Sequence, residues 1–442
     1  MLKRNIYQSL LEWKTEKGRR PLLLRGARQT GKTYIVNEFG QSEFSHFIAL
    51  NFERNPEYKD IFNIKDPFEI LERISLFTGK KIYHSQTLIF LDEIQECPNA
   101  IMALRYFYEE IPELYIIGAG SLLEFALKQE GFRMPVGRVQ YLYMYPLTFG
   151  EFMYALNEDF LYNYVMAGKH LSNMPQALHE KLIQYVRKYF MIGGMPAVVN
   201  EYVETKDILR CQKIQYLLLD TYRDDFGKYA RQSKFAYLKK VFTQIPNMIG
   251  QKFIYAHVDK SLKSRDLKEA LELLETAGIA YKVKKTSGMG IPLATGSNDA
   301  FFKILFLDVG LMHAASGIYG ETVRSKDLTA IFKGAVAEQF VGQELIANAN
   351  PNRKKELYYW AREARNSNAE VDYLIEKNNK IIPIEVKSGA PGRMKSMKIF
   401  LQQYNSPYGV KISQEKAAQT DKIITVPFYS VEYFIKKQKT KV

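Results

Sequence analysis

The chain has 442 residues, of which 46% are hydrophobic and 25% are charged, a balance typical of a globular protein with several domains. No stretch approaches the roughly 18 consecutive apolar residues that a membrane-spanning helix needs, which excludes an integral membrane protein, and we expect no membrane partner. The 62 basic and 48 acidic side chains give a net charge of +14, which attracts polyanions, and two cysteines are too few for a disulfide framework.

The first section, residues 1–160, alternates apolar runs with helical patterns. Its first twenty residues scatter their charges and lack the apolar core of a secretory signal, which favours a cytoplasmic protein. The apolar runs are PLLLRG, SHFIALNFE, TLIFLDE, LYIIGAG and VQYLYMYPL. Such alternation predicts a parallel sheet flanked by helices.

A glycine-containing loop, GARQTGKT, follows the first of these runs and precedes a helical pattern. Its spacing fits the phosphate-binding pattern G-x-x-x-x-G-K-[ST], or Walker A, in the strand–loop–helix context that gives the match meaning. We expect the loop amides and the positive end of the next helix to hold the phosphates of ATP. The residues expected to bind the nucleotide are Gly26, Ala27, Arg28, Gln29, Thr30, Gly31, Lys32 and Thr33.

Four side chains of this section have expected roles in catalysis. Lys32 would bridge the β- and γ-phosphates, and Thr33 would ligate Mg²⁺. The run TLIFLDE leads to Asp92 and Glu93 at the end of a buried strand, where parallel sheets bind ligands. Asp92 would hold Mg²⁺ through its water shell, and Glu93 would polarise the attacking water. A plain glycine turn would explain the glycines of the loop but not the Lys-Thr pair.

The two middle sections have different patterns. Residues 161–235 have a helical pattern, which predicts a lid or connector. Residues 236–330 contain helical patterns followed by two strand-like segments with turn residues between them. A helix followed by a hairpin resembles a winged helix, so we expect a winged-helix-like module here. The last section, residues 331–442, has the order helix, three strands, helix.

Several of these motifs together resemble one protein family. The loop, LDEIQE, GAGSLL and GRVQYLYMYPLTFGEF are similar to prokaryotic AAA+-type ATPases that carry a C-terminal domain of unknown function with a nuclease-like fold. The resemblance covers nearly the whole chain. It implies that Ser121 senses the γ-phosphate, although this position usually holds Asn or Thr, and that Arg138 reaches a nucleotide. Arg138 has the alternative of a structural ion pair with Glu151 or with a carboxylate of the lid.

The resemblance implies a PD-(D/E)xK-like nuclease core for residues 331–442, and the residues there can also be analysed independently. Asp372 lies in one expected strand, and Glu385 and Lys387 share one face of the next. If these strands pair, Asp372 and Glu385 can converge on Mg²⁺, and Lys387 can orient water for hydrolysis of a phosphodiester. The resemblance adds Glu338, on the preceding helix, as a further ligand. A hairpin with outward charges would give a similar pattern.

The sequence therefore predicts an α/β protein with a P-loop AAA+-like domain, a helical lid, a winged-helix-like module and a PD-(D/E)xK-like domain. We expect ATP and Mg²⁺ as cofactors and an ATPase that couples nucleotide state to the binding or processing of DNA. Assembly into a homo-oligomer is compatible with this prediction. The alternative is a nucleotide-gated switch or scaffold whose nuclease-like domain is inactive and binds a protein or a nucleic acid.

Overall fold

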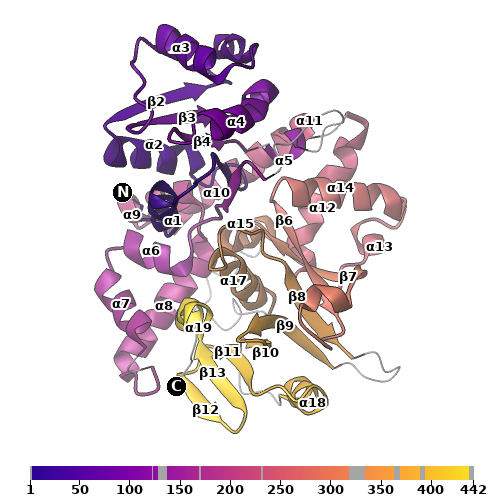
Figure 1. The fold of residues 1–442 in the computed structure, drawn as a ribbon. Coiled ribbons are helices and arrows are strands. Elements are labelled where there is room, and N and C mark those ends of the chain that lie inside the picture. The colour runs from indigo at the N-terminus through magenta and orange to yellow at the C-terminus, as the bar shows by residue number, and fades with distance from the viewer. Residues whose placement is uncertain are drawn as a thin grey trace. The chain divides into compact units, whose positions relative to one another are not determined.

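In the computed structural model, most of the chain is described and forms two compact units. Figure 1 labels the helices and strands of both. The described residues are 2–121, 123–127, 137–168, 171–229, 232–317, 334–362, 369–388 and 394–437. One unit consists of Lys3–Tyr145 and Asn350–Lys354, and we call it the N-terminal unit. The other, the C-terminal unit, consists of Met1–Leu2, Pro146–Ala349 and Lys355–Val442.

The N-terminal unit is built on a parallel sheet of five strands in the order β2-β3-β4-β1-β5. The strands are β1 (Leu22–Arg25), β2 (His46–Asn51), β3 (Thr87–Asp92), β4 (Tyr115–Ala119) and β5 (Gln140–Tyr143). Every residue of β3 is buried, which explains why this strand has a continuous apolar run instead of an alternating one. The predicted parallel sheet of the first section is thus confirmed.

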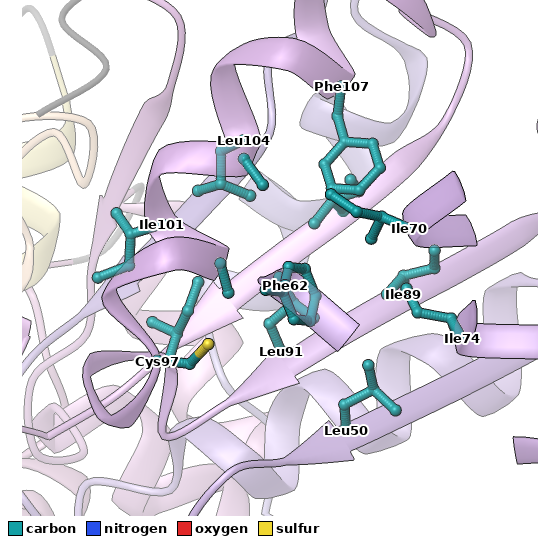
Figure 2. Packing of buried hydrophobic residues seen from close by; sticks show 14 of the residues in the cluster. Leu50, Phe62, Ile70, Ile74, Ile89, Leu91, Cys97, Ile101, Leu104 and Phe107 are labelled. Carbon is teal, nitrogen blue, oxygen red and sulfur yellow. The ribbon is translucent and has the colours of Figure 1, made fainter. Parts of the chain in front are cut away.

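Helices cover both faces of this sheet. They are α1 (Ile6–Thr15), α2 (Lys32–Glu43), α3 (Pro67–Thr78), α4 (Pro98–Glu110) and α5 (Leu123–Ala126). Successive residues of β1 point to opposite faces, so Leu23 packs in one apolar cluster, and Leu22 and Leu24 pack in another. The first cluster joins the sheet to α3 and α4 (Figure 2), and the second joins it to α1 and α2.

The C-terminal unit contains an eight-stranded mixed sheet in the order β12-β13-β11-β10-β9-β8-β6-β7. Its strands are β6 (Ala280–Thr286), β7 (Ser297–Phe306), β8 (Leu357–Ala361), β9 (Glu370–Lys377), β10 (Lys380–Lys387), β11 (Gly409–Ser413), β12 (Ala418–Thr420) and β13 (Ile423–Pro427). Strands β9 and β10 form an antiparallel hairpin, and β11 runs parallel to β10.

This sheet crosses the expected boundary at residue 330. The sequence predicts a winged-helix-like module over 236–330 and a separate domain after it. In the structure, the hairpin β6–β7 is joined to the strands of the last section because β6 pairs in parallel with β8. Strands β11, β12 and β13 also follow helix α18 (Lys395–Gln403), in a part of the chain for which the sequence analysis predicted no strand.

The remaining helices all belong to the C-terminal unit. They are α6 (Phe149–Ala155), α7 (Asp159–Ala167), α8 (Gln176–Ile192), α9 (Pro196–Thr205), α10 (Ile208–Asp224), α11 (Phe226–Tyr229), α12 (Phe235–Gln244), α13 (Tyr255–Val258), α14 (Ser264–Thr276), α15 (Val309–Ala315), α17 (Gly334–Ala347), α18 (Lys395–Gln403) and α19 (Val431–Lys436). Helix α17 is buried continuously from Val336 to Ile346 and contributes polar as well as apolar side chains to the interior. None of the described helices combines the length and the apolar character that crossing a bilayer requires.

Candidate functional site

The loop between β1 and α2 is held in a tight, specific backbone conformation. Three of its residues have positive φ, a region that glycine adopts readily. Two of them are glycines, Gly26 (φ 150°) and Gly31 (φ 93°), and the third is Gln29 (φ 65°). A Cβ atom on Gly26 would lie only 2.1 Å from the carbonyl oxygen of Met144, so a larger residue would displace the loop. Inside the loop, the buried hydroxyl of Thr30 donates to the carbonyl oxygen of Ala27 at 2.9 Å.

Arg4, which the sequence analysis did not single out, supports this loop. Its guanidinium donates to the carbonyl oxygens of Thr30 at 2.9 Å and Tyr145 at 2.6 Å. Tyr145 follows β5, so Arg4 ties the loop to the adjacent edge of the sheet. No local pattern around Arg4 indicates this contact, because its partners are 26 and 141 positions away.

Lys32, the first residue of α2, is buried against the loop. Its ammonium donates to the carbonyl oxygens of Gly26 at 2.9 Å and Ala27 at 2.8 Å. Burial lowers the pKa of Lys32 to about 8, and the nearby carboxylates of Glu93 and Asp92 oppose this shift. Phosphate oxygens would be stronger partners for this ammonium than neutral carbonyls, because they carry formal charge.

Asp92, at the end of β3, is joined to the start of α2 and to the end of β2. The Thr33 hydroxyl donates to Asp92 Oδ1 at 3.0 Å, and the Asn51 amide donates to Oδ2 at 2.8 Å. Burial raises the pKa of Asp92, and these two hydrogen bonds oppose the shift. A hydroxyl and a carboxylate are oxygen donors of the type that Mg²⁺ prefers, so Thr33 and Asp92 fit this cation. The sequence analysis did not identify Asn51.

Glu93 follows Asp92 in the left-handed conformation, with φ 50° and ψ 45°. Its Oε2 accepts a hydrogen bond from the Gln95 side-chain amide at 2.7 Å and one from the Ser121 backbone amide at 3.4 Å. Since β3, β4 and β1 are neighbours in a parallel sheet, the acids, Ser121 and the loop all lie at the carboxyl edge. The sequence analysis did not identify Gln95.

Arg138 lies apart from these groups within the N-terminal unit. It precedes β5, and β5 runs parallel to β1 with Gln140 opposite Leu22, so Arg138 lies at the amino edge of the sheet. Its guanidinium forms an ion pair with Glu109 of α4, with Nε 2.9 Å from Oε1. Glu151, the partner considered in the sequence analysis, forms a capping box with Thr148 at the start of α6.

The C-terminal unit brings together the second set of predicted residues around an additional lysine. Lys303 of β7 is only 1% exposed, and its Nζ lies 2.9 Å from Glu338 Oε1. The same atom lies 2.6 Å from Glu370 Oε1 and 3.4 Å from Asp372 Oδ1. The sequence analysis did not identify Lys303, because β7 belonged to the expected winged-helix-like module, and it also missed Glu370, the first residue of β9. Burial raises the pKa of Glu338, and the neighbouring Asp372 carboxylate adds to this effect.

The hairpin β9–β10 brings Asp372 close to Glu385 and Lys387. Asp372 Oδ2 accepts a hydrogen bond from the backbone amide of Val386 at 2.8 Å. Lys387 Nζ lies 2.6 Å from Glu385 Oε1, which places these two side chains on the same face, as expected for residues two apart in a strand. The other oxygen of Glu385, Oε2, is buried and has no hydrogen-bond partner in the described part of the chain. Burial raises the pKa of Glu385.

The sequence predicts three metal ligands in this second cluster, and the structure does not bring the three together around one point. Among the described residues, no group of three or more His, Cys, Asp and Glu side chains is arranged to hold a metal. Two of the three expected ligands, Glu338 and Asp372, contact the ammonium of Lys303 instead. The buried, unpartnered Oε2 of Glu385 is the feature that fits a cation, because an unsatisfied buried carboxylate oxygen is energetically costly.

Comparison with known proteins finds three matching families and one relative. Residues 18–153 match the family described as AAA domain. Residues 183–322 and 333–430 match two domains of unknown function, DUF8612 and DUF4143. An uncharacterized protein of Haemophilus influenzae is 23% identical over 385 residues, which cover 84% of this chain and 82% of that protein.

Two of the solved structures that the chain matches are the following. The Walker-type ATPase PABY2304 of Pyrococcus abyssi is 16% identical, with a TM-score of 0.44, and the match covers 72% of this chain and 96% of that one. The RuvB Holliday junction branch migration motor of Thermotoga maritima is 17% identical, with a TM-score of 0.26 and coverages of 64% and 90%. The match to the AAA domain includes the loop, Asp92 and Glu93, so the family comparison and the site geometry together support an ATPase of the P-loop type.

Proposed function

We propose that this chain is a Mg²⁺-dependent ATPase whose nucleotide state controls the binding or processing of a nucleic acid. The observation that carries the ATPase assignment is the hydrogen bond of 3.0 Å between Thr33 and Asp92, beside the buried ammonium of Lys32. The loop supplies phosphate ligands, and the end of β3 supplies the acids. The start of α2 adds backbone amides that have no partner within the helix, together with the positive end of the helix dipole.

Each group has a defined task in this proposal. Lys32 exchanges the carbonyl oxygens of Gly26 and Ala27 for oxygens of the β- and γ-phosphates. Thr33 and Asp92 would hold Mg²⁺, which would supply positive charge next to the phosphates. Glu93 accepts a proton from the water that attacks the γ-phosphorus. The bond from that phosphorus to the bridging oxygen breaks, and ADP and phosphate leave.

The test of the ATPase proposal is the Glu93→Gln variant. We expect it to bind ATP like the wild type and to release phosphate about a hundredfold more slowly or worse, since a general base contributes roughly 10²–10⁴ in rate. Glu96→Gln is the matched control, because Glu96 lies on the same segment, with its side chain 44% exposed in a surface ion pair with Lys59. Equal loss of binding and turnover in Glu93→Gln, or no turnover by the wild type, would refute the assignment. Binding without turnover by the wild type would favour a nucleotide-gated switch.

We also propose that the second cluster binds one divalent cation and hydrolyses a phosphodiester. The specific observation is the unpartnered Oε2 of Glu385, next to Asp372 on the paired strand. Lys303 lies closer to Glu338 and Glu370 than to Asp372, whose Oδ1 is 3.4 Å away, so Asp372 and Glu385 would act as the ligands. Lys387 contacts Glu385 and would orient the attacking water.

Two readouts test this second proposal. We expect Mg²⁺ or Mn²⁺ to raise the melting temperature, because a ligand that binds the folded state stabilises it, and to support nicking of DNA. Asp372→Ala should lose both effects, and Lys387→Ala should lose nicking alone. Lys380→Ala, at the exposed start of the same strand, is the control for the lysine variant. Absence of both metal effects in the wild type would rule out the site, and stabilisation without nicking would limit it to binding.

A further inference from the structure

We propose that Gln95 is a positioning residue that holds the Glu93 carboxylate for the hydrolysis step, an inference that rests on the proposed ATPase function. The Gln95 amide donates to Glu93 Oε2 at 2.7 Å, and the Ser121 backbone amide approaches the same oxygen at 3.4 Å. No described residue donates a hydrogen bond to the other oxygen, Oε1. One oxygen is thus restrained by the protein, and the other is left for a water molecule.

The space for Gln95 depends on Gly120. A Cβ atom on Gly120 would lie 1.8 Å from Gln95 Oε1 and 3.0 Å from its Cδ. The φ angle of Gly120 is not in the left-handed region, so its backbone conformation does not require glycine. Glycine at position 120 therefore leaves the space that the Gln95 amide occupies beside Glu93.

The backbone after β3 also directs Gln95 toward Glu93. The left-handed conformation of Glu93 turns the chain into a 3-10 turn over Ile94–Glu96, whose first residue is fully buried. Because of this turn, the side chain of Gln95 lies against the Glu93 carboxylate. The Gln95 amide must point its nitrogen toward Glu93 Oε2, because a flipped amide would place the Gln95 oxygen against this negatively charged oxygen.

A general base acts only when its lone pair faces the proton that it removes, and a small misplacement can lower the rate about a hundredfold. Loss of the Gln95 amide leaves Glu93 in place but frees it to rotate. We therefore expect Gln95→Ala to lower kcat by about 10- to 100-fold and to change the Kd for ATP by less than about twofold. Gly120→Ala should give a similar loss of kcat, because the added Cβ displaces the amide without removing it.

The deciding experiment is a double-mutant cycle on kcat with wild type, Gln95→Ala, Glu93→Gln and the double variant. If Gln95 acts through Glu93, its substitution has no further effect once Glu93 is replaced by glutamine. An additive loss in the double variant, or a kcat that is unchanged or increased in Gln95→Ala, would overturn the inference. Melting temperatures establish that each variant is folded, and Gln95→Met, which is similar in size and has no donor, should match Gln95→Ala.

The cycle also separates failure of this inference from failure of the proposed function. A wild type that does not hydrolyse ATP, or that keeps full turnover after Glu93→Gln, refutes the ATPase assignment and the role of Gln95 with it. A wild type that loses turnover on Glu93→Gln but not on Gln95→Ala refutes the role of Gln95 alone.

Discussion

Lys32 illustrates how one buried cation can prepare a site for an anionic ligand. Its ammonium has lost most of its hydration and contacts two neutral carbonyl oxygens, and burial lowers its pKa from 10.5 to about 8. Phosphate groups in the same position would favour the charged form much more strongly. Nucleotide binding at this site should therefore be coupled to the protonation of Lys32.

We expect the affinity for ATP to fall as the pH rises above about 8. Above that pH the free protein loses the Lys32 proton while the complex keeps it, so binding must take up a proton and Kd rises by up to about tenfold per pH step of one. Calorimetry from pH 7 to pH 9.5 at constant Mg²⁺ measures this effect. Lys32→Arg is the control, because a guanidinium stays charged throughout this range. A wild-type affinity that does not change with pH would contradict the coupling.

Some residues of the candidate sites belong to contiguous sequence motifs, and others act only through residues that are distant in the chain. Lys32, Thr33 and Asp92 belong to contiguous patterns, so the sequence alone predicts them. Arg4 acts through backbone carbonyls far along the chain, and Lys303 acts across strands whose pairing is not local. Neither has a neighbouring pattern that could have identified it.

At the level of elements, helix α17 carries a second perturbed carboxylate in the interior of the C-terminal unit. Glu344 Oε1 accepts a hydrogen bond from the Phe149 backbone amide at 2.9 Å, and Oε2 accepts one from the Asn348 amide at 2.9 Å. Burial raises the pKa of Glu344 to about 8, and the nearby carboxylate of Glu432 adds to the shift. Glu344 therefore takes up a proton at a higher pH than an ordinary glutamate.

We expect Glu344→Gln to weaken the pH dependence of stability. The pKa of Glu344 is about 8 in the folded protein against 4.5 ordinarily, so its contribution is complete below pH 4.5 and is lost as the pH rises to 8. The loss is on the order of a few kcal/mol for such a shift. A glutamine fits at position 344 because the Asn348 side chain can flip. Its Oδ1, which has no partner among the described residues, then accepts a hydrogen bond from the new amide.

Thermal melts between pH 5 and pH 8 measure this difference. The melting temperature of the wild type should fall across the range more steeply than that of Glu344→Gln. Glu272→Gln, on the exposed face of α14, is the control and should follow the wild type. The same slope in Glu344→Gln and wild type would mean that another group controls the pH dependence.

The elements themselves were predictable to different degrees. The five strands of the N-terminal unit come from short runs rich in apolar residues that alternate with helical patterns, so the signal is local and predicts the parallel sheet. The pairing of β6 with β8 joins Val283 to Leu357, and no periodicity within either segment encodes a contact over that separation. Strand β11 is a short segment, GVKIS, that gives little periodicity to analyse.

At the level of the whole molecule, the net charge of +14 supports a polyanionic partner. We expect the protein to bind DNA with an affinity that falls at least tenfold between about 50 and 200 mM salt, because each neutralised phosphate releases condensed counterions. Fluorescence anisotropy of labelled single- and double-stranded DNA measures this slope. A change of affinity on adding a non-hydrolysable ATP analogue would indicate coupling to nucleotide state. No binding at low salt would favour a protein partner instead.

The central claim is that ATP binds with Mg²⁺ at the loop from Gly26 to Thr33. Its most direct test is calorimetric titration of ATP with Mg²⁺ into the wild type and into Lys32→Ala, with Lys17→Ala as an exposed-lysine control. We predict saturable binding by the wild type and by Lys17→Ala, and no measurable binding by a folded Lys32→Ala variant. Undiminished affinity in Lys32→Ala would contradict the claim.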